Sequence, residues 1–266
     1  MCKKFLSVVL VLALGSVVLA GTVQWADANN SAPVGAWETV SNWSWTLPDS
    51  GLPTLNDTVR AFRADGQGAN ITVTSTDGTA KAGKLQFKHS ASSIVHLSIS
   101  GYLENSGSVE MTTSKTYVTI QTGGRWDSCT IQSGSAFYLG GGTNADENVN
   151  VYGTLNVAAN LNIGGTAGGN AFLNIYNSGV VNADSYTINT AANRKINLYG
   201  SGRMYVKGNV VTQAQADIDD ERITCDISKP LAVYDEGTNK TMIYNIPEPV
   251  TIALLGLGGL LFRRKH

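Results

Sequence analysis

The sequence predicts an all-β protein, a right-handed parallel β-helix (solenoid) with about 23 residues in each coil. Similar segments recur so that Tyr152, Tyr176 and Tyr199 are spaced by 24 and 23 residues. Apolar and polar residues alternate within each copy, as in strands with one buried face. Residues 85–211 are rich in Gly, Asn, Ser, Thr and β-branched residues and contain almost no helical pattern. An antiparallel sandwich would also give short alternating strands, but not the same residues at a constant period.

The clearest copies are residues 149–157, 173–183 and 196–206, with weaker copies at 97–101 and 118–123. In each clear copy, one aliphatic pair precedes a glycine corner and a second pair follows it. The alternation points these pairs inward: Val149/Val151, Leu173/Ile175 and Ile196/Leu198 before the glycine, then Leu155/Val157, Val181/Ala183 and Met204/Val206 after it. Stacked coils about 4.8 Å apart would therefore form aliphatic ladders inside the solenoid.

The same alternation points an asparagine and a tyrosine of each copy outward. Tyr152, Tyr176 and Tyr199 would then form a row along the solenoid. One interpretation is an aromatic strip on which glycan rings stack. The other is that the row only stabilises the stack of coils.

Both flanks of the repeats are expected to close the solenoid. Residues 21–84 form a polar leader and a Trp-rich segment with Trp37, Trp43 and Trp45, which predicts an N-terminal cap or, alternatively, a sugar-stacking surface. Residues 212–246 predict a C-terminal cap. It would comprise a short helix over 213–221 with Thr212 as N-cap, and a hairpin whose strands flank residues 235–239.

The first twenty residues predict a secretory signal peptide. Lys3 and Lys4 form a short basic region, residues 5–19 are apolar, and small residues precede a cut between Ala20 and Gly21. Cleavage by signal peptidase would leave 246 residues, enough for one sizeable all-β domain.

Residues 247–266 form a tail in three parts. These are Pro247-Glu248-Pro249, thirteen uncharged residues at 250–262, and Arg263-Arg264-Lys265. Thirteen helical residues span roughly 20 Å against about 30 Å of hydrocarbon, so a transmembrane helix here is marginal in length and a buried C-terminal helix is the alternative. Three glycines within the apolar part make a poor water-soluble helix. The basic cluster lies where a membrane-spanning segment carries the positive charges that keep its end in the cytoplasm, a basic stop.

The order of these three parts resembles the PEP-CTERM sorting signal of certain bacteria, over less than a tenth of the chain. This resemblance implies export, at least transient anchoring in the membrane, and processing by an exosortase-type enzyme outside the cell. The Trp-rich opening and the ending before the tail also resemble those of exported β-solenoid proteins.

The charge distribution argues against nucleic-acid binding. Five of the 19 basic residues lie in residues 1–20 and 263–266, which leaves 14 basic and 20 acidic residues over 21–262, a net charge of −6. Affinity for a phosphate backbone requires a basic surface.

The sequence predicts neither a catalytic site nor a cofactor. Residues 149–206 contain four charged residues, of which only Asp184 is a carboxylate, whereas polysaccharide cleavage needs paired carboxylates or a carboxylate-bound metal. The alternative is a carbohydrate-active β-helix of the polysaccharide lyase or glycosidase kind. His89 and His96 are expected to be solvated or packed rather than metal ligands.

Two acidic clusters are interpreted as solvent-exposed. Residues 144–148 alternate oxygen-bearing side chains, which favours a solvated turn over a weak calcium site. Asp217, Asp219, Asp220 and Glu221 predict a solvated helix face. Cys129 and Cys225 could form a disulfide or remain free thiols.

These observations together predict an exported, non-enzymatic structural or adhesive protein. It would lie in the bacterial cell envelope, at the surface or in the extracellular matrix, and associate with exopolysaccharide. A passive stalk without a ligand is a further alternative.

Overall fold

The computed structural model describes most of the chain between residues 22 and 245. The described ranges are 22–25, 34–38, 43–45, 52–60, 69–78, 80–87, 94–111, 115–130, 134–140, 146–164, 169–190, 193–226 and 229–245. The predicted signal peptide, its cut at Ala20 and Gly21, and the whole tail from Pro247 lie outside these residues.

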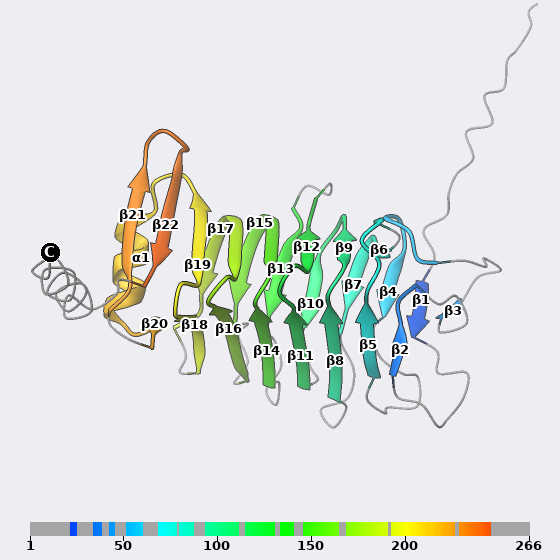
Figure 1. Cartoon of the computed structure of the whole chain (residues 1–266). Coiled ribbons are helices and arrows are strands. Elements are labelled where there is room, and N and C mark those ends of the chain that lie inside the picture. The colour runs from blue at the N-terminus through cyan, green and yellow to red at the C-terminus, as the bar shows by residue number, and fades with distance from the viewer. Residues whose placement is uncertain are drawn as a thin grey trace, which may run out of the picture.

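The described chain is an all-β solenoid of about six coils, as the sequence predicted. Its strands lie side by side along one axis and form two sheets (Figure 1). The eight-stranded sheet contains β2 (Val34–Ala36), β5 (Ala69–Val73), β8 (Ile94–Ile99), β11 (Lys115–Ile120), β14 (Asp146–Val151), β16 (Asn170–Tyr176), β18 (Arg194–Tyr199) and β20 (Ile223–Cys225).

The fourteen-stranded sheet lies across the core from it. It contains β1 (Thr22–Trp25), β3 (Trp43–Trp45), β4 (Thr58–Arg60), β6 (Ala80–Ala82), β7 (Lys84–Gln86), β9 (Tyr102–Asn105), β10 (Val109–Met111), β12 (Arg125–Ser128), β13 (Ala136–Leu139), β15 (Thr154–Ile163), β17 (Val180–Ile188), β19 (Arg203–Lys207), β21 (Leu231–Asp235) and β22 (Lys240–Tyr244).

Parallel pairing joins each coil to the next. Val151 pairs with Ile175, and Ile175 pairs with Leu198, so these coils have the predicted 24- and 23-residue periods. Ile120 pairs with Val151, 31 residues later, because the segments between β12 and β13 and between β13 and β14 are longer than those of the preceding coil. Parallel pairing extends toward the N-terminus as far as β1 and β2.

The inward aliphatic residues form one continuous core. All twelve residues of the predicted inward pairs are buried, with exposed fractions between 0% and 6%. Stacking of apolar side chains from coil to coil removes them from water, which is the main favourable contribution to folding. The predicted inward face is therefore confirmed for residues 149–206.

The corners of the coils require glycine, because the preceding coil leaves no room for a side chain. A Cβ on Gly153, Gly179 or Gly202 would lie 2.2, 2.0 or 2.2 Å from a backbone carbonyl oxygen of the preceding coil. No side chain fits at such a distance, so the backbones of successive coils approach closely only because these corners lack a Cβ.

A helix and an antiparallel hairpin follow the last coil. Helix α1 (Val211–Asp219) lies beside the hairpin of β21 and β22, and β22 pairs antiparallel with β19 (Figure 1). The prediction of Thr212 as N-cap is wrong. The cap position is Val210, which has no side-chain capping bond, and Thr212 lies within the first turn.

The prediction of a solvated helix face at Asp217, Asp219, Asp220 and Glu221 is wrong for Asp217. Asp217 is only 4% exposed, and its carboxylate accepts hydrogen bonds from the Tyr186 hydroxyl (2.8 Å) and the Arg222 Nε (2.7 Å). The amphipathic pattern failed here because a buried tyrosine and an arginine from outside the helix supply partners for the charge. Asp219, Asp220 and Glu221 are exposed as predicted.

Candidate functional site

The outward tyrosines of the eight-stranded sheet stack on one another. The ring centroids of Tyr152 and Tyr176 lie 4.5 Å apart with 7° between the planes, and those of Tyr176 and Tyr199 lie 4.6 Å apart with 10°. This spacing is the distance between neighbouring strands, which the parallel register imposes on equivalent side chains. Burial, together with the two neighbouring phenols, raises the pKa of Tyr176.

Face-to-face stacking determines what this tyrosine row can present to a ligand. Tyr176 has both ring faces covered by its neighbours, so a sugar ring can reach only its edge and its hydroxyl group. The geometry therefore favours stabilisation of the coils as the function of the row, with glycan stacking confined to its two ends.

A row of asparagines runs beside the tyrosines on the same face. The Asn174 amide donates to Asn150 Oδ1 (2.9 Å), and the Asn197 amide donates to Asn174 Oδ1 (2.8 Å). The Thr224 hydroxyl donates to Asn197 Oδ1 at 2.7 Å and ends the row. Each amide thus provides a hydrogen bond to the amide oxygen of its neighbour. These bonds stabilise the stack and orient every side chain in the same direction.

A second polar row lies on the outer face of the fourteen-stranded sheet. Asn182 donates its amide to Asn156 Oδ1 (2.8 Å), and Asn156 donates to Asp127 Oδ1 (2.6 Å). Burial alone would raise the pKa of Asp127, but hydrogen bonds from Arg125 and Asn156 and the Arg125 charge lower it below its ordinary value. This row, Asp127–Asn156–Asn182, begins at an ionised carboxylate and ends at the Asn182 amide.

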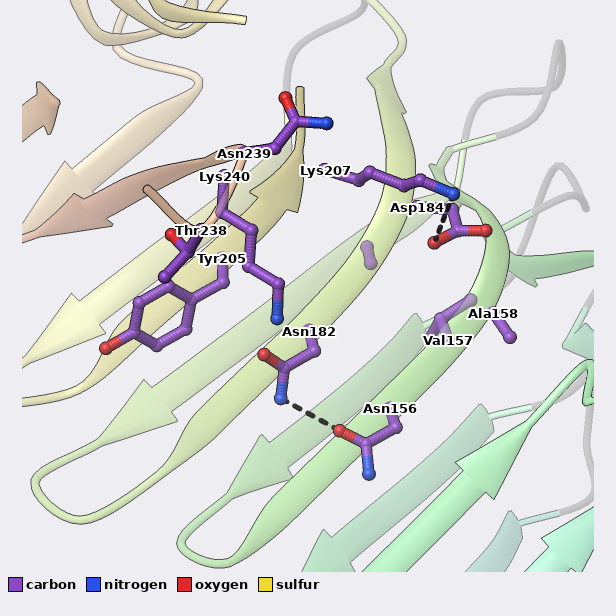
Figure 2. Close-up of a pocket in the computed structure, with 11 residues that line it drawn as sticks. Asn156, Val157, Ala158, Asn182, Asp184, Tyr205, Lys207, Thr238, Asn239 and Lys240 are labelled. Carbon is purple, nitrogen blue, oxygen red and sulfur yellow. Dashed lines mark hydrogen bonds and ion pairs between the residues drawn. The ribbon is translucent and has the colours of Figure 1, made fainter. Parts of the chain in front are cut away.

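The Asp127 row leads into a groove beside the C-terminal hairpin. This hairpin groove has a volume of about 400 Å³ and adjoins a hollow of about 380 Å³ that shares part of its lining. Its polar lining comes from β15, β17, β19, the hairpin turn and β22, namely Asn156, Asn182, Asp184, Tyr205, Lys207, Thr238, Asn239 and Lys240 (Figure 2). The half-buried Tyr205 ring and the Lys240 side chain lie next to the end of the asparagine row (Figure 2).

The charges in the hairpin groove are unevenly paired. Lys207 Nζ lies 4.0 Å from Asp184 Oδ1. Asp235 accepts hydrogen bonds from the Thr238 hydroxyl (2.8 Å) and the Gly237 amide (3.0 Å), which lower its pKa. Among the residues that the structure describes, Lys240 forms no ion pair, and its ammonium group points toward Asn182 (Figure 2).

One carboxyl group is buried inside the solenoid. Glu147 is fully buried at an inward position of β14, and neither carboxyl oxygen has a hydrogen-bond partner among the described residues. Burial chiefly, with the negative charge of Asp146, raises the pKa of Glu147 to about 9. The interpretation of 144–148 as a solvated turn is wrong for Glu147, because it alternates in phase with the core residues Val149 and Val151.

The other predicted residues are only partly within the described chain. Trp37 is fully buried, whereas the side chains of Trp43 and Trp45 are not described. His96 is exposed and stacks on Tyr117 at 5.2 Å, and His89 lies outside the described residues. Cys129 is buried and Cys225 half-buried, and no disulfide joins them.

The sorting motif Pro247-Glu248-Pro249, the basic stop Arg263-Arg264-Lys265 and the apolar segment between them all fall outside the described residues. Within the described ranges there is no helix whose length and apolarity would suffice to cross a membrane. In the same ranges, no group of three or more His, Cys, Asp or Glu side chains is arranged to hold a metal ion.

Sequence reasoning did not identify the hairpin groove. The outward positions of Asn156, Asn182 and Tyr205 follow from the same alternation that revealed the core. Their proximity to Lys240 follows from the antiparallel pairing of β22 with β19, which places Lys240 opposite Lys207. Comparisons with protein-family models, curated proteins and solved structures found no match to this chain.

Proposed function

We propose that this chain is an exported, non-enzymatic structural or adhesive protein of the bacterial surface or extracellular matrix that associates with exopolysaccharide. The observation that carries the proposal is the Asp127 row of hydrogen-bonded amides. It leads into a groove with the half-buried Tyr205 and with Lys240, which has no ion pair within the described ranges. Planar amides and aromatic rings on a rigid framework bind hydroxyl-rich ligands with little loss of conformational freedom.

Export and sorting are proposed from the two terminal segments. The signal peptide would be removed between Ala20 and Gly21, and the tail that begins at Pro247 would act as a PEP-CTERM signal. Its apolar part would form a transient transmembrane helix, with Arg263-Arg264-Lys265 on the cytoplasmic side. An exosortase-type enzyme would then process the tail outside the inner membrane.

The solenoid itself suits a structural function. The rows of tyrosine and asparagine on its eight-stranded sheet stabilise the stack without charged groups, and its inner rows are aliphatic. We further propose that α1 and the hairpin cap its C-terminal end, and that the Trp-rich segment with the buried Trp37 caps its N-terminal end. Capped ends would prevent the solenoids from pairing edge to edge.

The chemistry of the accessible carboxylates favours binding over catalysis. A glycosidase needs one carboxylic acid that remains protonated near neutral pH. Glu147 has a raised pKa but is fully buried, whereas the pKa of Asp235 is lowered by hydrogen bonds within the hairpin turn. Asp184 is exposed, and its Oδ1 lies 4.0 Å from Lys207 Nζ.

The test is to measure the mass and location of the mature protein in separated envelope and medium fractions of the native host. We expect a product that begins near Gly21, ends near Pro247 and lies outside the inner membrane. The matched control replaces Pro247-Glu248-Pro249 by Ala-Gln-Ala, which should leave the tail uncut and the chain in the membrane. A wild-type product that retains residues 250–266 in the membrane would contradict sorting and identify the tail as a plain anchor.

A further inference from the structure

We propose that the hairpin groove is a binding site for a negatively charged sugar unit, a uronic acid within an acidic polysaccharide. This inference rests on the proposed function and specifies its ligand. It assigns the sugar ring to Tyr205, the hydroxyl groups to Asn156 and Asn182, and the carboxylate to Lys240 (Figure 2).

The asparagines supply directional hydrogen bonds for the sugar hydroxyls. Asn182 uses one amide hydrogen on Asn156, and Asn156 uses one on Asp127. Each primary amide has a second hydrogen, and the Asn182 oxygen accepts no hydrogen bond from the described residues, so donors and an acceptor remain at the groove. Because the Asp127 row holds these amides in place, a bound sugar would not have to order them.

Tyr205 supplies an apolar surface within the polar lining. It is half-buried on β19, and its neighbour in the preceding coil is Asn182 rather than another aromatic residue. In contrast to Tyr176, no ring contact with Tyr205 occurs among the described residues. Met242 lies opposite Tyr205 on β22, so the C–H groups of a pyranose would pack on the part of the half-buried ring that lines the groove.

Lys240 supplies the charge that distinguishes an acidic sugar from a neutral one. Lys240 lies directly opposite Lys207 on β19 and opposite Asp235 on β21, and Asp235 accepts its hydrogen bonds within the hairpin turn. Lys207 is close to Asp184, whereas Lys240 has no ion pair among the described residues. A sugar carboxylate would therefore gain a charge-assisted hydrogen bond from Lys240.

The experiment measures binding of the full-length chain, purified in mild detergent, to hexagalacturonate and to its methyl ester by isothermal titration calorimetry. The ester has the same ring, length and hydroxyls but no charge. We expect tighter binding of the acid, and we expect Lys240→Gln to weaken it about tenfold while leaving the ester unchanged. Tyr205→Leu should weaken both ligands, because the ring contacts sugar carbons in either.

Lys115→Gln is the matched control, since Lys115 is an exposed lysine on the other sheet. Circular dichroism and thermal unfolding verify that each variant is folded. Equal affinity of wild type and Lys240→Gln for the acid would overturn the groove as the site, while binding itself would leave the proposed association with polysaccharide intact. Absence of binding to either ligand and to a wider glycan array would contradict both proposals.

Discussion

The ring of Tyr176 lies 4.6 Å from that of Tyr199, one coil further along the solenoid and on a residue that pairs with it in register. Tyr176 also stacks on Tyr152, so it alone of the three takes part in two ring contacts. The consequence is that the energetic cost of removing a tyrosine depends on its place in the row.

We therefore expect Tyr176→Leu to lower the free energy of unfolding by about 2 kcal/mol, and Tyr199→Leu by about half as much, because each stacked pair contributes about 1 kcal/mol. Urea unfolding followed by circular dichroism measures both. Tyr138→Leu is the control, since Tyr138 is 40% exposed and has no ring contact among the described residues. Equal losses for Tyr176→Leu and Tyr138→Leu would show that the row contributes nothing to stability.

The corner glycines predict a second effect on stability. In Gly179→Ala the new methyl carbon would lie 2.0 Å from the Val151 carbonyl oxygen, so two coils must separate locally. We expect a loss of about 2 kcal/mol or more, in the range of overpacked interiors. Gly237→Ala is the control, because the nearest atom to its new Cβ is a flexible side-chain oxygen at 3.3 Å. Similar melting temperatures for the two variants would contradict the proposed close approach of the backbones.

The regular coils could be predicted from the sequence because the alternation and spacing of their residues are visible within each repeat. Alternation identifies Leu173 and Ile175 as inward residues, and the constant spacing of the tyrosines identifies their register. The 31-residue spacing between the paired residues Ile120 and Val151 could not be predicted, because the additional residues of this coil do not follow the repeat pattern.

The sequence contained one further signal that was not used. Glu147 is in phase with Val149 and Val151, which already places it inward, yet a charged residue is normally assigned to the surface because isolated buried charges are costly. The hairpin groove is a different case. It depends on which strand the hairpin pairs with, and alternation within a single strand carries no information about that pairing.

Glu147 predicts an unusual dependence of stability on pH. Its pKa is about 9 in the folded chain, against an ordinary value near 4.5, so the folded state favours the protonated form. Its contribution to stability is therefore fully present below about pH 4.5 and decreases as the pH rises toward 9. Glu147→Gln keeps the shape without the ionisation, so it should resemble wild type at pH 4.5 and exceed it at pH 8 by roughly 1 to 3 kcal/mol.

Urea unfolding at pH 4.5, 7 and 9 measures this difference. The control is Glu236→Gln at an exposed position of the hairpin turn, which should run parallel to wild type at all three values. A constant difference between wild type and Glu147→Gln across this range would mean that Glu147 is ionised in the folded chain, and the explanation from burial would be wrong.

Asp217 predicts how strongly the C-terminal helix is held to the last coil. Its two carboxylate oxygens accept from Tyr186 at 2.8 Å and from Arg222 at 2.7 Å, and the Tyr186 and Asp217 side chains are both buried. In Asp217→Asn the half-buried Arg222 guanidinium loses its buried partner and keeps only its ion pair with the exposed Asp220, so we expect a loss of about 2 kcal/mol. Tyr186→Phe removes only the hydroxyl donor and should cost about 1 kcal/mol, because Asp217 keeps its charged partner.

Asp219→Asn is the matched control on the same helix, since Asp219 is exposed and its ion pair with Lys229 is screened by water. Hydrogen exchange would localise the effect, with faster exchange of the α1 amides in Asp217→Asn and unchanged protection of β14 and β16. Protection of α1 equal to that of wild type would mean that the helix is held by its apolar contacts alone.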